Sequence, residues 1–340
     1  MKSSYLEIIG LLKNHRRIVL TTHVNPDGDA LGSEIALCAV LRQMGKDVAV
    51  LNHSATPSNY LWLDPAGIIT TFVPEQHRDL LLNAELIIIL DTNQPDRLRS
   101  LEPFVRESRA VKIVIDHHLE PSDFGQHYLI DEESTSTGEL IYKLLQAMDG
   151  IEFSAEIATA LYTAIMTDTG SFRFPRTDAE THRITAHLLE SGADPTRIYV
   201  NVYEQWSPNR MRLLGEVLDS MKTAYDGKLA YVVCTQKMFR DTGTTEVETD
   251  NFTTYPMSIA GVVIGILFNE LKKGVKISFR SKGTIPVNQL AKEVGGNGHL
   301  NAAGARLFDV SLQDAVNDVT ARAEKYLVQQ RADKITPHHQ

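Results

Sequence analysis

Short apolar runs that alternate with helix-like segments constrain the fold of this chain more than any other feature. Residues 86–90 are an unbroken run of leucine and isoleucine, and residues 111–115 are nearly as apolar. Strands that are buried on both faces have such continuous runs, whereas half-exposed strands alternate apolar and polar residues. Between these runs, as at residues 31–44, apolar side chains recur at helical spacing. The alternation predicts an open, mainly parallel α/β sheet flanked by helices.

The same patterns predict the order of elements along the chain. In the first half, strands are expected at 17–21, 47–51, 86–90 and 111–115, and helices at about 31–44, 137–148 and 155–166. Gly192, Pro195 and Pro208 then punctuate a polar and aromatic stretch. A helix at about 210–224 leads to a second α/β unit, with strands near 229–234, 262–268 and 275–280 and helices near 287–294 and 312–329.

The length of 340 residues exceeds what one hydrophobic core comfortably supports, so two domains are expected. We place a larger N-terminal domain at residues 1–190 and a linker with a connecting helix at 191–224. A smaller α/β domain follows at 225–330, and a polar tail at 331–340.

The charge and the apolar runs exclude several functional classes. A net charge of −9 argues against a protein that grips long duplex DNA, which needs a broad basic surface. A short anionic substrate stays compatible, because the charge of bound metal ions is absent from this count. The chain opens without a secretory signal and has no apolar run long enough to span a bilayer. We therefore expect a cytoplasmic protein without a membrane partner, and the sequence leaves homodimer formation open.

Acidic and histidine residues follow the predicted strands where those strands end. They are His23, Asp27 and Asp29 after the first strand, Asp91 after residues 86–90, Asp116, His117 and His118 after residues 111–115, and Asp168 after a predicted helix. The carboxyl ends of parallel strands face one crevice, where ligands bind. Separate segments therefore deliver carboxylates and imidazoles to one edge of the sheet.

This set of side chains favours a pair of divalent metal ions. Ligands rich in oxygen, with one or two imidazoles, suit Mn²⁺ or Mg²⁺ better than structural Zn²⁺. Clustered carboxylates repel one another unless cations neutralise them. Two ions about 3.5–4 Å apart would do so and would form a phosphoester-hydrolysing site. Asp91, alone at a strand end, is well placed to bridge the pair.

Each motif also has a purely structural interpretation. Residues 25–28 could form an ordinary turn, with Asp29 as the N-cap of the next helix. Asp91 could simply end a strand, and Asp168 could be a local cap. The segment 116–118 is harder to explain in this way, because burying three titratable groups without partners is costly.

Together the motifs resemble those of a known family, the DHH phosphoesterases. His23–Asp29, Asp91, the Asp116-His117-His118 triplet and Asp168 are similar to its four N-terminal motifs. The segment 295–304, which begins Gly-Gly-Asn-Gly-His, resembles the glycine-rich signature of the associated DHHA1 domain. The order and the chain length are typical of the branch that acts on nanoRNA and on adenosine 3′,5′-bisphosphate (pAp). Asn297 departs from the pattern, since many members have a third glycine there.

The resemblance implies a role for each of these residues. One metal would be held by His23, Asp27 and Asp91, and the second by Asp29, Asp91, His117 and Asp168. His118 and Asp116 would be catalytic, with His118 contacting the reacting phosphate or protonating the leaving oxygen, and Asp116 orienting an imidazole. Substrate would be bound by Arg280, Ser281, Gly295, Gly296, Gly298 and His299, with the glycines at a helix start. The structural alternative is that Arg280 is a surface charge and the glycines form only a tight turn.

The resemblance also implies the reaction and the place where it occurs. We expect two divalent ions, Mn²⁺ first and Mg²⁺ or Co²⁺ as alternatives, in a cleft between the two domains. The substrates would be single-stranded oligoribonucleotides of two to five nucleotides, cut to mononucleotides, or pAp, converted to AMP. Alternatives within the family are a RecJ-like exonuclease, a linear dinucleotide phosphodiesterase and an exopolyphosphatase or pyrophosphatase. A nucleotide-binding sensor without catalysis is the alternative of another class.

Overall fold

A computed structural model describes residues 3–118 and 121–333, apart from the side chains of residues 299 and 328–333. The chain divides into two compact units, Met1–Gln205 and Trp206–Gln340. The division falls inside the segment 191–224 that the sequence predicts as a linker.

The first unit is built on a fully parallel sheet. Its strands are β1 (Arg17–Thr21), β2 (Asp47–Asn52), β3 (Ile69–Thr71), β4 (Leu86–Leu90), β5 (Val111–Asp116) and β6 (His127–Ile130). They lie in the order β3-β2-β1-β4-β5-β6, and every neighbouring pair is parallel. The prediction of a mainly parallel sheet is confirmed.

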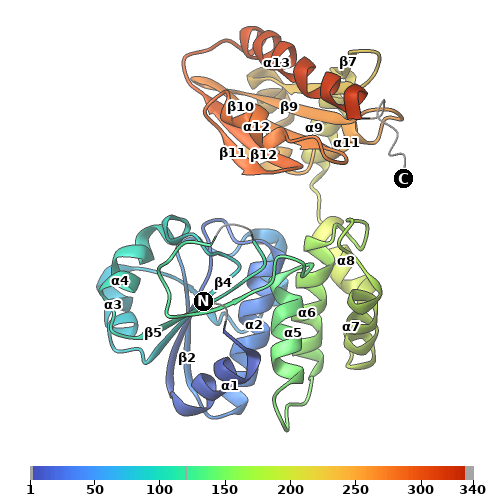
Figure 1. Ribbon diagram of the computed structural model, residues 1–340. Helices are drawn as coiled ribbons and strands as arrows, with labels where there is room; N and C mark the ends of the chain where they lie inside the picture. Colours follow the sequence, from blue (N-terminus) through green and yellow to red (C-terminus); the bar gives the residue numbers. More distant parts are fainter. Residues whose placement is uncertain (1–2, 119–120, 334–340) are drawn as a thin grey trace. The chain divides into compact units, whose positions relative to one another are not determined.

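Helices cover both faces of this sheet, as Figure 1 shows. The helices of this unit are α1 (Tyr5–Asn14), α2 (Gly28–Gln43), α3 (Pro74–Leu82), α4 (Glu102–Glu107), α5 (Thr137–Gln146), α6 (Ala155–Asp168), α7 (Ala179–Glu190) and α8 (Pro195–Tyr203), with 3₁₀ turns η1 (Ser58–Leu63) and η2 (Pro95–Leu101). In β4, Leu86, Ile88 and Leu90 pack in one core with α2, α5 and α6. Ile87 and Ile89 point to the other face, in the core that α3 and α4 complete. Strand alternation thus places every side chain of β4 in a core, which explains its continuous apolar run.

The strand order fixes where a ligand can bind in this unit. The chain adds β2 and β3 on one side of β1, then reverses and adds β5 and β6 beyond β4. The order therefore reverses between β1 and β4, which are direct neighbours. In open α/β sheets, the crevice at such a switch point is the usual ligand site.

The second unit is a mixed sheet with helices on both faces. Its strands are β7 (Lys222–Ala224), β8 (Leu229–Cys234), β9 (Ile264–Leu271), β10 (Gly274–Ser281), β11 (Asn297–His299) and β12 (Ala302–Leu307). The order is β11-β12-β10-β9-β8-β7, with β8 and β9 parallel and the other pairs antiparallel. One core involves α12 (Val287–Lys292) and α13 (Leu312–Asp333), and another involves α9 (Pro208–Asp219), α10 (Gln236–Thr242) and α11 (Thr254–Met257), with η3 (Glu246–Thr249) nearby.

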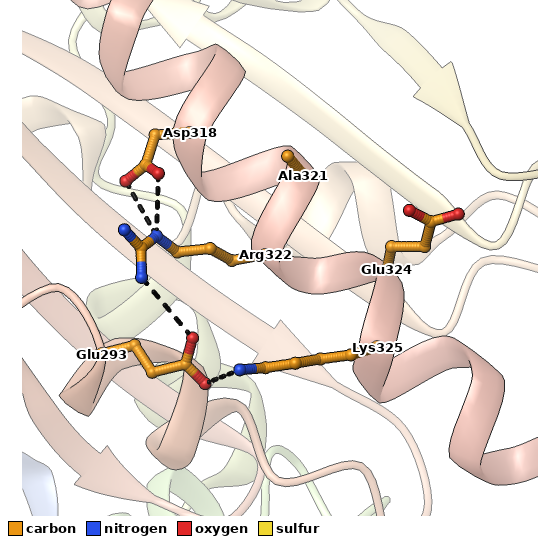
Figure 2. Close-up of a pocket in the computed structure, with 6 residues that line it drawn as sticks. All are labelled: Glu293, Asp318, Ala321, Arg322, Glu324 and Lys325. Atoms are coloured by element: carbon orange, nitrogen blue, oxygen red, sulfur yellow. Dashed lines mark hydrogen bonds and ion pairs between the residues drawn. The ribbon is translucent and has the colours of Figure 1, made fainter.

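A surface ion network joins α13 to the end of α12 (Figure 2). Glu293 directly follows α12. Its Oε1 forms an ion pair with Lys325 Nζ at 2.6 Å, and its Oε2 lies 3.8 Å from Arg322 Nη1. Arg322 also pairs with Asp318 within α13, at 2.8 Å. Such exposed pairs contribute little stability individually. This network connects the two helices and includes every charged residue that lines the surface depression drawn in Figure 2 except Glu324.

Two sequence-based expectations are wrong in the second unit. The helix expected at 210–224 ends at Asp219, and residues 222–224 form β7 as an edge strand beside β8. The glycine-rich segment does not begin a helix. It follows α12 and enters the β11–β12 pair, where two glycines let the neighbouring backbone segments approach closely. A Cβ added to Gly296 would lie 2.2 Å from the Gly304 carbonyl oxygen, and one added to Gly298 would lie 2.4 Å from Ala303 Cα.

Among the described residues, no helix has both the length and the apolar character that crossing a membrane requires.

Candidate two-metal site

The predicted metal and catalytic residues of the first unit come together at the switch point of its sheet. Three groups of potential ligand atoms form there, each within 4.8 Å: His23 with Asp27 and Asp91; Asp29 with His117 and Asp168; and Asp91 with Asp116, His117 and His118. The connection after β1 supplies the first ligands, the end of β4 supplies Asp91, and β5 leads into the histidine pair. Asp168 is the last residue of α6.

Asp91 lies at the centre of these groups and faces both His23 and His117. Its Oδ2 is 3.2 Å from His23 Nε2, and its Oδ1 is 3.6 Å from His117 Nε2. The residue is buried and has a left-handed backbone, with φ of 58°, directly after β4. Its amide still donates to the Ile115 carbonyl at 3.0 Å. A non-glycine residue held in this way is strained, and such strain concentrates at functional sites.

The imidazoles of His23 and His117 differ in what their Nε2 atoms contact. His23 Nδ1–H donates to the Val24 carbonyl at 2.9 Å, and His117 Nδ1–H donates to the Ser134 carbonyl at 3.4 Å. His23 Nε2 also hydrogen-bonds with Asp91 Oδ2, and although burial lowers the pKa of His23, this bond and the charge of Asp91 raise it. A metal ion that bound His23 Nε2 would replace the proton shared with Asp91.

His117 provides the sharper test of whether a metal fits. Its Nε2 is buried and has no hydrogen-bond partner among the described residues. Carboxylate oxygens surround it, with Asp168 Oδ2 at 3.3 Å and Asp29 Oδ2 at 3.7 Å. Burial also lowers the pKa of His117, so that the ring is neutral. A neutral, orphaned nitrogen surrounded by carboxylates fits a divalent cation.

The carboxylates themselves repel one another in this arrangement. Burial raises the pKa of Asp29 well above its ordinary value, and the charge of Asp91 raises it further. Partial burial and the charge of Asp91 act on the pKa of Asp168 in the same direction. Burial would also raise the pKa of Asp91, but its hydrogen bond with His23 and the nearby histidines lower it instead. The cluster thus carries excess negative charge that bound cations would neutralise.

His118 is oriented differently from the two histidines just described. Asp116 Oδ1 accepts from His118 Nδ1–H at 2.7 Å and from the His117 amide at 2.8 Å. Burial would lower the pKa of His118, but the hydrogen bond to Asp116 and the charge of Asp91 raise it to about 9. At neutral pH the ring is therefore protonated and suited to donate a proton. Asp116 orients His118 rather than His117.

Asp27 and Asp29 have different positions at the start of α2: Asp27 caps the helix, and Asp29 lies in its first turn. Asp27 is the N-cap, because its Oδ1 accepts from the amides of Asp29 and Ala30 at 3.1 and 3.2 Å. The structural interpretation that made Asp29 the cap is therefore wrong. Asp29 lies in the first turn of α2 and points into the ligand cluster, fully buried.

Sequence reasoning missed the residues that hold Asp29 and Asp91 in place. At the start of α5, the amides of Thr137 and Gly138 donate to the two carboxylate oxygens of Asp29 at 2.7 and 2.8 Å. The Thr137 hydroxyl donates to Asp91 Oδ1 at 3.0 Å. A helix N-terminus is a natural site for an anion. The small polar residues before α5, with Ser136 as N-cap, were the available signal.

Of the substrate-binding residues expected in the second unit, Arg280 and Ser281 end β10, whereas Gly298 lies in β11 with Gly295 and Gly296 just before it. Arg280 is half-buried, its Nη1 donates to the Phe279 carbonyl at 3.1 Å, and burial lowers its pKa. Ser281 Oγ donates to the Ile285 carbonyl at 2.7 Å and accepts from Asn301 Nδ2 at 2.8 Å, so its hydroxyl stabilises the local turn. The side chain of His299 lies outside the described residues.

Comparison with known proteins identifies both halves of the chain. The N-terminal domain of the DHH family matches residues 17–165, and the DHHA1 domain matches residues 226–329. The family resemblance of the motifs is confirmed.

Relatives and solved structures match almost the whole chain. The bifunctional oligoribonuclease and PAP phosphatase NrnA of Thermus thermophilus is 31% identical, over 89% of this chain and 87% of its own length. The Bacillus subtilis protein of the same name is 27% identical over 91% and 95%. The crystal structure of an exopolyphosphatase-related protein from Bacteroides fragilis is 34% identical, with a TM-score of 0.91 over 95% of this chain and 96% of that one.

Proposed function

Because this chain belongs to the DHH family of phosphoesterases, we propose that it hydrolyses short oligoribonucleotides to mononucleotides, converts pAp to AMP, or does both. The curated relatives from Thermus thermophilus and Bacillus subtilis are named for these two activities. The observation that carries the proposal is the position of Asp91, whose two oxygens face His23 Nε2 and His117 Nε2. One carboxylate shared by two imidazole sites is what a two-metal phosphoesterase requires.

The family uses divalent metal ions, and the ligand set fits two of them. We propose that His23, Asp27 and Asp91 hold one ion, and that Asp29, Asp91, His117 and Asp168 hold the other. When bound, the ions supply Lewis-acid stabilisation of charge on the phosphoryl oxygens. Mn²⁺ is the proposed ion, since carboxylates with a few imidazoles suit it, and Mg²⁺ and Co²⁺ are alternatives.

His118 and the second unit complete the proposed mechanism. Protonated His118, held by Asp116, gives its proton to the leaving oxygen as the ester bond breaks. In the second unit, we propose that Arg280, with Ser281, His299 and the backbone of Gly295, Gly296 and Gly298, binds a phosphate or base away from the scissile bond. An active site in a cleft between the domains, a cytoplasmic location and a possible homodimer stay predictions.

A turnover assay with matched substrates tests the function. The metal-loaded protein is incubated with a diribonucleotide, with pAp and with pyrophosphate, and EDTA is added in parallel. We expect hydrolysis of the diribonucleotide or pAp, no hydrolysis with EDTA, and recovery when Mn²⁺ is restored. Preferred hydrolysis of pyrophosphate would instead match the exopolyphosphatase-related name of the Bacteroides fragilis protein. Binding without turnover would indicate a nucleotide sensor.

The role of Arg280 is tested by comparing natural and minimal substrates. Arg280→Ala should lower kcat/KM for the diribonucleotide or pAp about ten- to a hundredfold, the worth of one charged hydrogen bond. Bis-p-nitrophenyl phosphate should be cleaved nearly as before, because it lacks the distal phosphate. Arg240→Ala, at an exposed arginine of the same unit, is the matched control. Equal losses on both kinds of substrate would contradict a binding role.

A further inference from the structure

The chain makes a strained turn immediately after the metal-site residue Asp168. Gly170, Ser171 and Phe172 have φ values of 57°, 60° and 63°, so three consecutive residues are left-handed. Two of them carry side chains that disfavour this conformation. The turn is held by backbone bonds, from the Ser171 amide to the Met166 carbonyl at 2.8 Å and from the Phe174 amide to the Thr169 carbonyl at 3.0 Å.

This turn separates two phenylalanines into different environments. Phe172 points inward, with ring centroids 5.8 Å from Tyr162 and 5.6 Å from His182. Phe174 points outward and is 52% exposed. Its ring lies over Gly170, where an added Cβ would be 2.6 Å from the ring atoms. One side of the Phe174 ring is thus supported by backbone two residues from Asp168, and much of the rest faces solvent.

Two exposed arginines flank this ring. Arg173 donates through Nε to the Gly170 carbonyl at 2.7 Å, and Arg176 lies two residues beyond Phe174. Neither arginine forms an ion pair with an acidic side chain in the described part of the chain. An aromatic ring between unpaired cations is the pattern by which proteins bind single-stranded nucleic acid.

We propose that Phe174 is a platform on which a nucleobase next to the reacting phosphate stacks, with Arg173 and Arg176 attracting the adjoining phosphate. The inference rests on the proposed function and deepens it, because it places a substrate determinant in the first unit itself. An exposed aromatic ring would add nothing to the binding of pyrophosphate. It would favour a nucleotide, because every base has an aromatic face and stacking tolerates any sequence.

The test compares substrates with and without the base. Phe174→Ala, Phe174→Tyr and the wild type are assayed on a dinucleotide and on the same dinucleotide with one abasic position, at either end. Phe174→Ala should lose about ten- to a hundredfold in kcat/KM on the intact dinucleotide, as stacked bases typically do on alanine substitution. It should match the wild type on one of the two abasic substrates, and Phe174→Tyr should retain activity on all. Leu189→Ala, which removes an exposed apolar side chain of the same unit, should change nothing.

A binding measurement makes the result independent of turnover. A dinucleotide with a hydrolysis-resistant phosphorothioate linkage and 2-aminopurine as one base is titrated in Mg²⁺. Stacking should quench its fluorescence with the wild type and with Phe174→Tyr, and not with Phe174→Ala. Equal quenching by all three proteins, or equal losses by Phe174→Ala on intact and abasic dinucleotides, would overturn the proposal. Absence of hydrolysis by the wild type would contradict the proposed function instead, and the quenching would still decide the stacking role.

Discussion

At the scale of single residues, the most specific prediction concerns Thr137, because its hydroxyl supports Asp91, the carboxylate proposed to bridge the two metal ions. Its Oγ1 donates to Asp91 Oδ1 at 3.0 Å inside a fully buried environment. Thr137→Val keeps the shape and removes the donor, so Asp91 loses its support. We expect the affinity for Mn²⁺ to fall about tenfold or more, as it does when such supporting bonds are lost.

Thr137→Ser is the matched control for this change. It keeps the hydroxyl and should bind Mn²⁺ nearly as the wild type does, in equilibrium dialysis or by electron paramagnetic resonance of the free ion. The thermal stability of all three metal-free proteins should be compared in parallel. Unchanged Mn²⁺ affinity in Thr137→Val would show that the hydrogen bond does not orient Asp91.

The contrast between Asp91 and Thr137 shows how much of the site the sequence could reveal. Asp91 was predictable because it follows an apolar run at the carboxyl end of a strand, where parallel sheets place ligands. Thr137 gave no such signal, because its role exists only once the start of α5 meets Asp29 of α2, more than a hundred residues earlier in the chain. The small polar residues before α5 indicate a helix N-terminus, but they do not show which distant carboxylates its amides and hydroxyl bind.

At the scale of elements, the contact between α2 and α6 sets the distance between two of the proposed metal ligands. Asp29 lies at the start of α2 and Asp168 at the end of α6. Gly32 lets the helices approach, because an added Cβ would be 2.3 Å from the Ala160 carbonyl oxygen. Gly32→Ala should force the helices apart and destabilise the metal-free protein by about 1–3 kcal/mol in urea unfolding. It should also weaken Mn²⁺ binding, since Asp29 moves with α2.

Gly10→Ala is the control for this prediction. Gly10 also lies in a helix, α1, but an added Cβ would have nothing within 4 Å. Removing a glycine there should leave Mn²⁺ affinity unchanged and stabilise the protein by up to about 1 kcal/mol. If Gly32→Ala behaved like Gly10→Ala, the close approach of α2 and α6 would have no part in forming the site.

The elements differ in how well the sequence predicted them. The strands β4 (Leu86–Leu90) and β8 (Leu229–Cys234) form at the residues expected, because β4 is buried throughout and β8 is mostly buried, and buried strands have apolar runs. The edge strand β6 (His127–Ile130) and the strand β12 (Ala302–Leu307) were missed. β12 reads Ala-Ala-Gly-Ala-Arg-Leu and lacks β-branched residues. It is a strand because it pairs with β10 along its whole length and because Gly298 lets the backbone of β11 approach its other side. Both causes are tertiary contacts, which strand propensity does not include.

At the scale of the whole molecule, each unit contains one tryptophan, which allows the two to be observed separately. Trp62 lies in η1 of the first unit, where Nε1 donates to the Asn59 carbonyl at 2.9 Å. Trp206 begins the second unit, with the Arg210 guanidinium 4.0 Å from its ring centre. Trp206→Phe therefore leaves a reporter of the first unit, and Trp62→Phe leaves a reporter of the second.

Metal removal should act on the reporter in the first unit, because every proposed metal ligand belongs to that unit. A ligand at a hundred times its Kd stabilises the folded state by about 2.7 kcal/mol, which for a unit of this size raises Tm by roughly 5–10 °C. We expect Mn²⁺ to raise the Tm reported by Trp62 by this amount relative to EDTA, and to leave that reported by Trp206 nearly unchanged. Adding Asp91→Ala to the Trp206→Phe protein should abolish the shift, because both ions lose a shared ligand. A Tm shift that persists in that variant would mean that Mn²⁺ stabilises the protein through other residues. That result would contradict the proposed two-metal site.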